Sequence, residues 1–401
     1  MTDPVRRGPP VASPRRVRGV SLVELLIGMA MGLLGLVVIA QVYANSQAQR
    51  RATTGAGDAQ QAGALAAWSL GRELRMAGAG LESGRFTWGC TLDVRHRDVP
   101  LLPGAGAWPA PFAAMPQALR LWPVLVRDGG AGASDVIVAM SGRSAAGNLG
   151  LSMSVASAGR IATASAVDFA PGDLLLAVST QRSERCLLGQ VDSTFVPPAA
   201  EAAQSLPTSP TGAPYNRAAG FGALPPGGDW QLLNLGGAPS LAMFGVAARG
   251  GLLQRDLLAP GGEAMTLADN VVNMQVLYGL DDGSAGGLAN DNVIDDWVQP
   301  GVAPWDFASL DDPASAVRVL QVKALRIALV TRGAERAATP APATLTLFGA
   351  LPERMTVDLP AADRPFPHQV LEFVVPLRNQ SLALCAEARR AQALPQGNAC
   401  D

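Results

Sequence analysis

Residues 18–43 read RGVSLVELLIGMAMGLLGLVVIAQVY, and the rest of the chain is organised around this stretch. From Leu25 to Tyr43 every residue is apolar or small except Gln41. A helix from Ser21 to Tyr43 would rise about 33 Å, because an α-helix rises about 1.5 Å per residue. That length crosses the hydrocarbon core of a bilayer. The stretch therefore predicts a membrane-spanning helix.

The segment before this helix is basic. It holds one acidic residue, Asp3, against Arg6, Arg7, Arg15, Arg16 and Arg18. A basic flank stays in the cytoplasm by the positive-inside rule, so the chain after the helix is expected on the opposite side of the membrane. Four prolines in the first 14 residues argue against a fold there.

A carboxylate, Glu24, lies at the start of the apolar run, shortly after Gly19. Carboxylates at membrane depth are costly and rare without a partner. The pattern of arginines, Gly19 and VSLVELLI resembles the type III signal of type IV prepilins and type II secretion pseudopilins. The resemblance implies cleavage by a membrane peptidase between Gly19 and Val20. It also implies that Glu24 pairs with the methylated amino terminus of a neighbouring subunit. Val20 departs from the family, in which Phe or Met is commoner.

An ordinary signal anchor is the alternative for this region. A Sec signal peptide has an apolar core of about 7–15 residues followed by a small-x-small cleavage site. The run here is longer, and no such site follows it. A simple anchor also has no need for Gly19 or for Glu24, so the prepilin interpretation is favoured.

Gly28 and Gly32 form a G-x-x-x-G pattern inside the apolar run. Small residues at this spacing let membrane helices approach closely. Glycine is also frequent in membrane helices generally, and it weakens a helix locally. Helix packing and local softness therefore both stay open for this pair.

Residues 45–78 are expected to continue the helix with an amphipathic pattern. Ala67, Leu70 and Leu74 share one helical face, with Leu65 and Trp68 beside it. A break is possible at Gly55 and Gly57, and Gly78 and Gly80 are expected to end the helix. In pilins, such a helix packs against a sheet with its second half.

Residues 71–90, GRELRMAGAGLESGRFTWGC, resemble the RE-L-R-x-AG…GC stretch of PilW-type minor pilins. This resemblance favours a minor pilin over a generic pseudopilin. It implies a single-pass inner-membrane protein with a periplasmic domain that enters a type IV pilus. The implied partners are other minor and major pilins, prepilin peptidase and the assembly platform in the inner membrane.

Short apolar runs follow Cys90 and are separated by Gly, Pro, Asp and Ser. Strands are expected at 135–140, 173–178, 241–246, 323–331 and 370–375, and residues 270–278 favour a strand over a helix. Because no long helices separate these runs, an antiparallel sheet is favoured over βαβ units. The fold class is therefore α+β and pilin-like, with a long N-terminal helix on an antiparallel β-rich domain.

The expected plan has four parts: a cleaved leader (1–19), a transmembrane helix (20–44), its amphipathic continuation (45–78) and a periplasmic β-rich domain (79–401). Two proline-rich stretches, 108–123 and 196–240, are expected to be loops. The second is interpreted as a flexible surface insertion, with an exposed partner-binding loop as the alternative.

Four cysteines allow three disulfide connectivities and fit an oxidising compartment. The favoured pairs are Cys90–Cys186 and Cys385–Cys400, the second like the disulfide-bounded C-terminal region of many pilins. Free buried thiols are the alternative. No C-x-x-C occurs, so a zinc or redox site has no support.

An acidic cluster spans residues 281–296, DDGSAGGLANDNVIDD. It follows a Tyr-Gly-Leu-Asp segment that resembles one preceding an Asp-rich loop in PilW-type proteins. The weak calcium candidates are Asp281, Asp282, Asp291 and Asp295, since calcium prefers oxygen ligands. The spacing does not match an EF-hand, so a solvated turn is favoured and no metal or cofactor is expected.

The charge balance and the lack of catalytic motifs argue against nucleic-acid binding and against an enzymatic function. Lys and Arg total 31 against 33 Asp and Glu, which is not the balance of a basic nucleic-acid surface. The two histidines, His96 and His368, are far apart, and no nucleophile elbow, P-loop or zinc-protease motif occurs. The expected function is that of a non-enzymatic minor pilin. The alternatives are a J-like minor pseudopilin of type II secretion and a membrane-anchored adhesin or binding domain.

Overall fold

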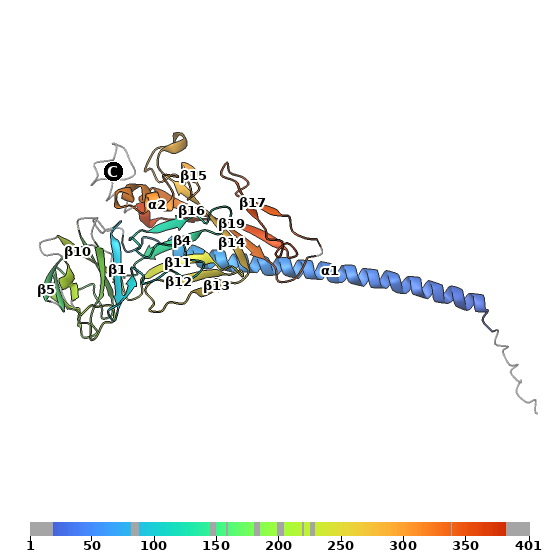
Figure 1. The fold of residues 1–401 in the computed structure, drawn as a ribbon, viewed down its shortest axis with the longest axis horizontal. Helices are drawn as coiled ribbons and strands as arrows, with labels where there is room; N and C mark the ends of the chain where they lie inside the picture. Colours follow the sequence, from blue (N-terminus) through green and yellow to red (C-terminus); the bar gives the residue numbers. More distant parts are fainter. Residues whose placement is uncertain are drawn as a thin grey trace, which may run out of the picture. The chain divides into compact units, whose positions relative to one another are not determined.

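The computed structural model describes residues 19–81, 88–144, 150–157, 159–179, 185–198, 204–218, 220–224, 229–337 and 339–381. The chain divides into two compact units, residues 1–51 and residues 52–401. The boundary between the units falls within the first helix, α1 (Leu22–Arg75) (Figure 1).

The first unit contains the apolar part of α1. Residues Leu22–Gln47 have a mean hydropathy of 2.5 and are long and apolar enough to cross a membrane. None of the most apolar window is buried within the chain. The expected helix is therefore present, and α1 begins three residues after Gly19. The helix is also continuous through Gly55 and Gly57, so neither glycine breaks it.

In the second unit, α1 buries one face. The buried positions recur every three or four residues, as one stripe of a helix requires: Ala59, Gly63, Ala66, Leu70 and Leu74. The expectation for Leu70 and Leu74 is confirmed, but Leu65 and Trp68 are 49% and 61% exposed. The small residues of the stripe, Ala59, Gly63 and Ala66, face the sheet, and their size lets the helix lie close to it.

The sheet beneath α1 has four antiparallel strands in the order β15–β14–β16–β19. Their bounds are β14 (Val271–Leu280), β15 (Asp296–Val298), β16 (Val322–Arg332) and β19 (His368–Pro376). The strands expected at 270–278, 323–331 and 370–375 are thus all present. A Cβ at Gly63 would lie 3.4 Å from Leu371 and 3.5 Å from Thr331, which places the helix directly on β16 and β19.

The second unit also contains a five-stranded sheet and a separate hairpin. A five-stranded antiparallel sheet has the order β13–β12–β11–β4–β3. Its bounds are β3 (Val124–Arg127), β4 (Val136–Ser141), β11 (Ser240–Val246), β12 (Leu252–Asp256) and β13 (Met265–Ala268). The hairpin β17 (Thr344–Leu347) and β18 (Met355–Asp358) packs against β14 and β16 through a small core of its own. Two short helices, α2 (Phe307–Leu310) and α3 (Ala316–Leu320), precede β16.

An eight-stranded sheet has the order β2–β1–β8–β7–β10–β5–β6–β9. Its bounds are β1 (Thr91–His96), β2 (Val99–Leu102), β5 (Leu151–Ser157), β6 (Arg160–Thr163), β7 (Leu174–Ser179), β8 (Arg185–Gln190), β9 (Gln204–Pro207) and β10 (Trp230–Gly236). The pair β1 and β8 is parallel, whereas the other pairs are antiparallel. Figure 1 shows β5 and β10 at the left of β1, and their side chains help form a separate hydrophobic core.

The outcome differs between the two expected loops. Residues 196–240 contain β9, a 3-10 turn (Gly220–Ala223) and β10, and β10 lies between β7 and β5 in the sheet. The expectation of a flexible insertion is therefore wrong for these strands, because cross-strand pairing overrides the local Pro and Gly content. Residues 108–123 form no helix or strand, yet they belong to the main core through Trp108, Phe112, Met115, Leu119 and Trp122.

Candidate assembly site

The expected processing site lies just before α1. Gly19 and Val20 precede the first helical residue, Leu22, and Val20 is 68% exposed. Glu24 lies in the first turn of α1, is exposed, and has no ion pair within the described residues. A carboxylate in the first helical turn is favoured by the helix dipole. The Gly19–Val20 bond is thus outside the helix, and the Glu24 side chain is exposed in its first turn.

The glycines of the apolar segment have open space beside them within the described part of the chain. A Cβ added at Gly28 or at Gly32 would meet no described atom within 4 Å. These positions therefore have no packing role within the described protein. Helix packing through the G-x-x-x-G face therefore stays a prediction, beside local softness of the helix.

The sequence RELR, residues 72–75, forms the last turn of α1 and ties it to the five-stranded sheet. Glu73 is 9% exposed, and its carboxylate accepts hydrogen bonds from Arg72 at 3.0 Å and from Arg143 at 3.3 Å. The Ser240 hydroxyl donates to the same carboxylate at 3.3 Å. Arg143 follows β4 and Ser240 begins β11, so Glu73 fixes the helix end against both strands.

The residues after Arg75 end the helix and turn the chain. The Asn379 side-chain amide donates to the carbonyl oxygens of Arg75 and Ala77 at 3.3 and 3.1 Å. Gly78 has a φ of 77°, a conformation that favours glycine. Its N–H donates to the carbonyl of Met140 in β4 at 2.8 Å. The Ala-Gly of the motif therefore stops the helix, because a glycine in the left-handed conformation commonly follows a helix C-terminus.

The other end of the packed helix segment lies against Gly333, which directly follows β16. A Cβ at Gly333 would overlap the carbonyl oxygen of Gly55. The Gln369 side chain donates to the carbonyl of Ala56 at 3.2 Å. Gly55 is therefore a close contact with the sheet and not the helix break that its residue type suggests. The sequence signal for this contact is a glycine on the buried stripe, four residues before Ala59.

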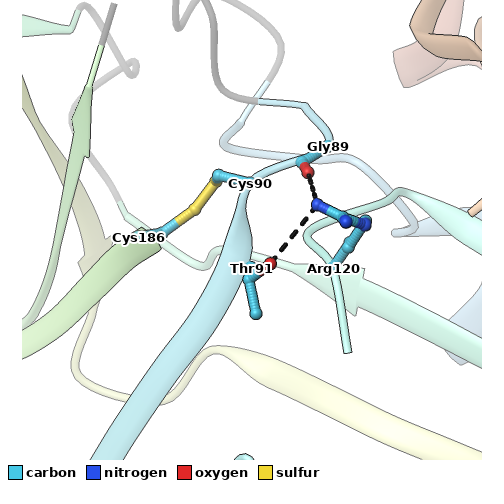
Figure 2. The surroundings of a disulfide bond; sticks show 5 residues. All are labelled: Gly89, Cys90, Thr91, Arg120 and Cys186. Carbon is cyan, nitrogen blue, oxygen red and sulfur yellow. Dashed lines mark hydrogen bonds between the residues drawn. A yellow bond between two sulfur atoms is a disulfide. The ribbon is translucent and has the colours of Figure 1, made fainter. Parts of the chain in front are cut away.

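The disulfide Cys90–Cys186 is present and joins the start of β1 to β8, with Cα atoms 5.7 Å apart. Figure 2 shows the Arg120 guanidinium on a neighbouring segment, donating to the Gly89 carbonyl at 2.9 Å and to the Thr91 hydroxyl at 3.3 Å. The disulfide therefore links the parallel strands β1 and β8, and the hydrogen bonds of Arg120 hold the backbone beside it. The expected pair Cys385–Cys400 lies outside the described residues.

The acidic loop after β14 is held by its own carboxylates. Asp281 is fully buried and accepts the N–H groups of Asp291 and Asn292 at 3.0 and 2.8 Å. Asp282, Asp291 and Asp295 accept from Ser284, Val293 and Gly283 in the same way. Within the described residues, no group of three or more acidic, His or Cys side chains is arranged to hold a metal. The candidate calcium ligands instead cap backbone amides one by one.

Lys323 lies beside Asp281, with 3.8 Å between Nζ and Oδ2. The lysine side chain is 7% exposed. Burial lowers the pKa of Lys323 to about 8, although Asp281 opposes this shift. Burial also raises the pKa of Asp281, against the effect of Lys323 and of the backbone N–H donors. This pair anchors the acidic loop to the start of β16.

The Tyr-Gly-Leu-Asp segment is structural. The Tyr278 ring is fully buried, and the N–H of Val126 in β3 donates to its hydroxyl at 2.6 Å. A Cβ at Gly279 would lie 3.0 Å from the Trp297 ring of β15. Asp135, which precedes β4, accepts the N–H of Val276 at 2.8 Å, and burial raises its pKa to about 8. Two buried polar groups therefore link β14 to the five-stranded sheet.

Comparison with known families gives one match. Residues 236–379 match the model of the family PilW, described as type IV pilus-assembly protein W. No curated protein and no solved structure matches the chain. The matched residues begin at the end of β10 and run past β19, so they cover the sheet beneath α1. The motifs at residues 19–24 and 71–90 lie outside this region. Two separate parts of the sequence therefore support a PilW-type pilus protein with a role in type IV pilus assembly.

Proposed function

We propose that this protein is a minor pilin that is cleaved after Gly19 and enters a type IV pilus as a filament or tip-complex subunit. The observation that carries the proposal is the combination of two features in one chain. A Gly19–Glu24 signal precedes an apolar helix, and the PilW match covers the sheet on which the same helix packs.

The division of α1 supports this role. Leu22–Gln47 is apolar and its most apolar window is unburied in its own chain, so this segment is suited to the membrane before assembly and to a filament core afterwards. The continuation from Ala59 onward is held by the sheet, by Glu73 and by Asn379.

Glu24 supplies the pairing group in this proposal. A buried carboxylate needs a counter-ion, and the methylated amino terminus of a neighbouring Val20 provides one. The pairing also sets the register between subunits, because each Glu24 accepts only one amino terminus. The partners are therefore other pilins, with prepilin peptidase acting first and the inner-membrane platform during assembly.

A second exposed surface favours subunit contacts. Leu65 and Trp68 are 49% and 61% exposed and lie on α1 away from its buried stripe, and Met76, which directly follows α1, is 40% exposed. The Arg72 guanidinium lies 5.2 Å from the Trp68 ring centroid. We assign this apolar stripe to contacts with neighbouring subunits.

Intact-mass measurement and N-terminal sequencing test the proposal. The protein is extracted from membranes of cells with and without prepilin peptidase. A mature chain that begins at methylated Val20 only when the peptidase is present is the expected result. A chain that begins at Met1, or that is cut elsewhere, contradicts the proposal and leaves an anchored periplasmic binding domain. Gene neighbours separate a pilus subunit from a type II secretion pseudopilin.

A further inference from the structure

We infer that the protein carries a binding site for a phosphate- or sulfate-type oxyanion on the face of β1 that bears Asp93 and Arg95. The site lies in the eight-stranded sheet and is independent of the proposed assembly role. Charge balance, strand register and a neighbouring hollow support this site.

One arginine already satisfies the buried carboxylate of this face. The Asp93 side chain is 5% exposed, and the Arg217 guanidinium lies 2.7 Å from its Oδ1. Arg217 also donates to the Asp93 carbonyl at 3.1 Å and is itself only 13% exposed. This pair is a well-packed ion pair that neutralises Asp93.

Two further guanidinium groups converge on the same carboxylate without completing a hydrogen bond to it. Arg185 Nη1 lies 3.7 Å from Oδ2, and Arg95 Nε lies 3.9 Å from Oδ1. Both distances exceed that of a normal hydrogen bond. The side chains are 73% and 38% exposed. Three guanidinium groups around one carboxylate leave two positive charges without a counter-ion among the described residues.

Among the described residues, nearby charges do not cancel this excess. Arg97 and Asp98 follow in the next turn, and they contribute one charge of each sign. Arg95 Nη1 donates to the Asp98 carbonyl at 3.1 Å, whereas the Asp98 carboxylate accepts the N–H of Ala218 at 3.2 Å. Arg95 Nε is buried and has no hydrogen-bond partner within the described residues. A buried donor without a partner is costly.

Strand register places the arginines on one rigid face. Arg185 of β8 is paired with Thr91 of β1 in the parallel register. Because alternate residues of a strand share a face, Thr91, Asp93 and Arg95 lie on the same side. The disulfide beside Thr91 joins the two strands (Figure 2). The spacing between Arg95 and Arg185 is thus set before any ligand binds, which lowers the entropic cost of binding.

A small hollow adjoins the arginines. Leu187, Asn216, Arg217 and Phe221 are among its lining residues. Arg217 is shared between the hollow and the arginine cluster. Leu187 is paired with Asp93 and so lies on the same face. Guanidinium groups bind phosphate oxygens through paired N–H donors. The hollow beside them is lined in part by the apolar side chains of Leu187 and Phe221.

Isothermal titration of the full-length protein in detergent tests this site. Inorganic phosphate and phenyl phosphate are the two probes, each at constant ionic strength and against a sodium chloride blank. The variants are Arg185→Gln and Arg95→Gln. The control is Arg354→Gln, because Arg354 is exposed and has no ion pair within the described residues. Thermal melting of each variant checks that it is folded. Because the Arg185 side chain is highly exposed, Arg185→Gln is expected to disturb folding less than Arg95→Gln.

Saturable binding of one phosphate per chain is expected, with the affinity reduced about tenfold in either site variant, because each variant removes a charged hydrogen-bond donor. The control variant is expected to bind like the parent protein. Tighter binding of phenyl phosphate identifies an organic phosphate as the natural ligand class, whereas equal binding identifies the free oxyanion. The absence of saturable heat with both probes, or equal affinity in all three variants, overturns the inference.

Discussion

The backbone of Gly333 lies against that of Gly55, so close that a Cβ at Gly333 would overlap the Gly55 carbonyl oxygen. The same Cβ would lie 2.7 Å from the Pro367 side chain. Gly333 directly follows β16 and Gly55 belongs to α1, so this contact sets how closely the helix approaches the sheet. Only glycine at position 333 permits it.

Replacement of Gly333 by Ala is expected to destabilise the domain by about 1–3 kcal/mol, as overpacking of a fixed contact does. Gly57→Ala is the matched control. It lies in the same helix as Gly55, and a Cβ there would meet no described atom within 4 Å. Alanine at position 57 is expected to stabilise the helix by up to about 1 kcal/mol. Urea unfolding of both variants measures this difference, and equal effects would contradict the proposed contact.

The parts of the fold that depend on local pattern are predictable from the sequence. The long apolar run at 22–47 and the alternating residues at 322–332 each favour one structure, whereas the run at 271–280 only favours a strand over a helix. The pairing of Cys90 with Cys186 is confirmed, although the sequence alone allows three connectivities.

The parts that the sequence does not predict depend on distant partners. Trp230–Gly236 is an apolar run in a Pro- and Gly-rich context, and it becomes a strand because β7 and β5 flank it. The helical pattern places Trp68 near the buried face, yet Gly63 and Ala66 face the sheet and leave it exposed. The arginine cluster around Asp93 joins residues more than 120 positions apart, and no local motif marks it.

Removal of the described disulfide is expected to cost about 2–5 kcal/mol, because Cys90 and Cys186 are 96 residues apart and the bond restricts the unfolded chain. The double variant Cys90→Ser/Cys186→Ser avoids a leftover thiol. Denaturant unfolding of this variant, beside the parent protein with and without reductant, measures the loss. An unchanged midpoint would mean that the bond does not form in the isolated protein.

Lys323 is the single lysine among 31 basic residues, and its side chain is buried. Its pKa is about 8 in the folded protein, below the ordinary value of 10.5. Between these values the unfolded chain binds the proton and the folded protein does not. Stability is therefore expected to rise from about pH 8 to pH 10, with a slope of up to about 1.4 kcal/mol per pH unit.

Urea unfolding at several pH values across this window measures the slope. Lys323→Met keeps much of the length of the side chain but removes the amine, so its stability is expected to be flat over the same range. The slope is the relevant quantity, because the variant also leaves Asp281 without its partner and lowers stability at every pH. A parent protein with no slope would contradict the burial of a neutral amine.

Trp68 and Leu70 lie two residues apart on different faces of α1. A substitution at Trp68 is expected to affect assembly, whereas a substitution at Leu70 is expected to affect stability. Trp68→Ala is expected to change the free energy of unfolding by less than about 0.5 kcal/mol, because the ring is 61% exposed. Leu70→Ala removes a fully buried side chain and is expected to cost about 2–5 kcal/mol. Pilus yield per folded subunit is then measured in cells. Normal yield with Trp68→Ala would remove this stripe from the assembly interface.

Glu24→Ala is expected to abolish entry of the protein into the pilus while leaving its folding and its cleavage after Gly19 unchanged. The reason is that Glu24 has no ion pair within the described residues, whereas its proposed counter-ion belongs to a neighbouring subunit. Glu24→Asp is the matched control, because it keeps the charge but shortens its reach by one methylene, and partial assembly is expected. Immunodetection of the protein in sheared pili and in membranes gives the two fractions. Normal pilus incorporation of Glu24→Ala would favour an anchored binding domain, whose function needs no pairing at this position.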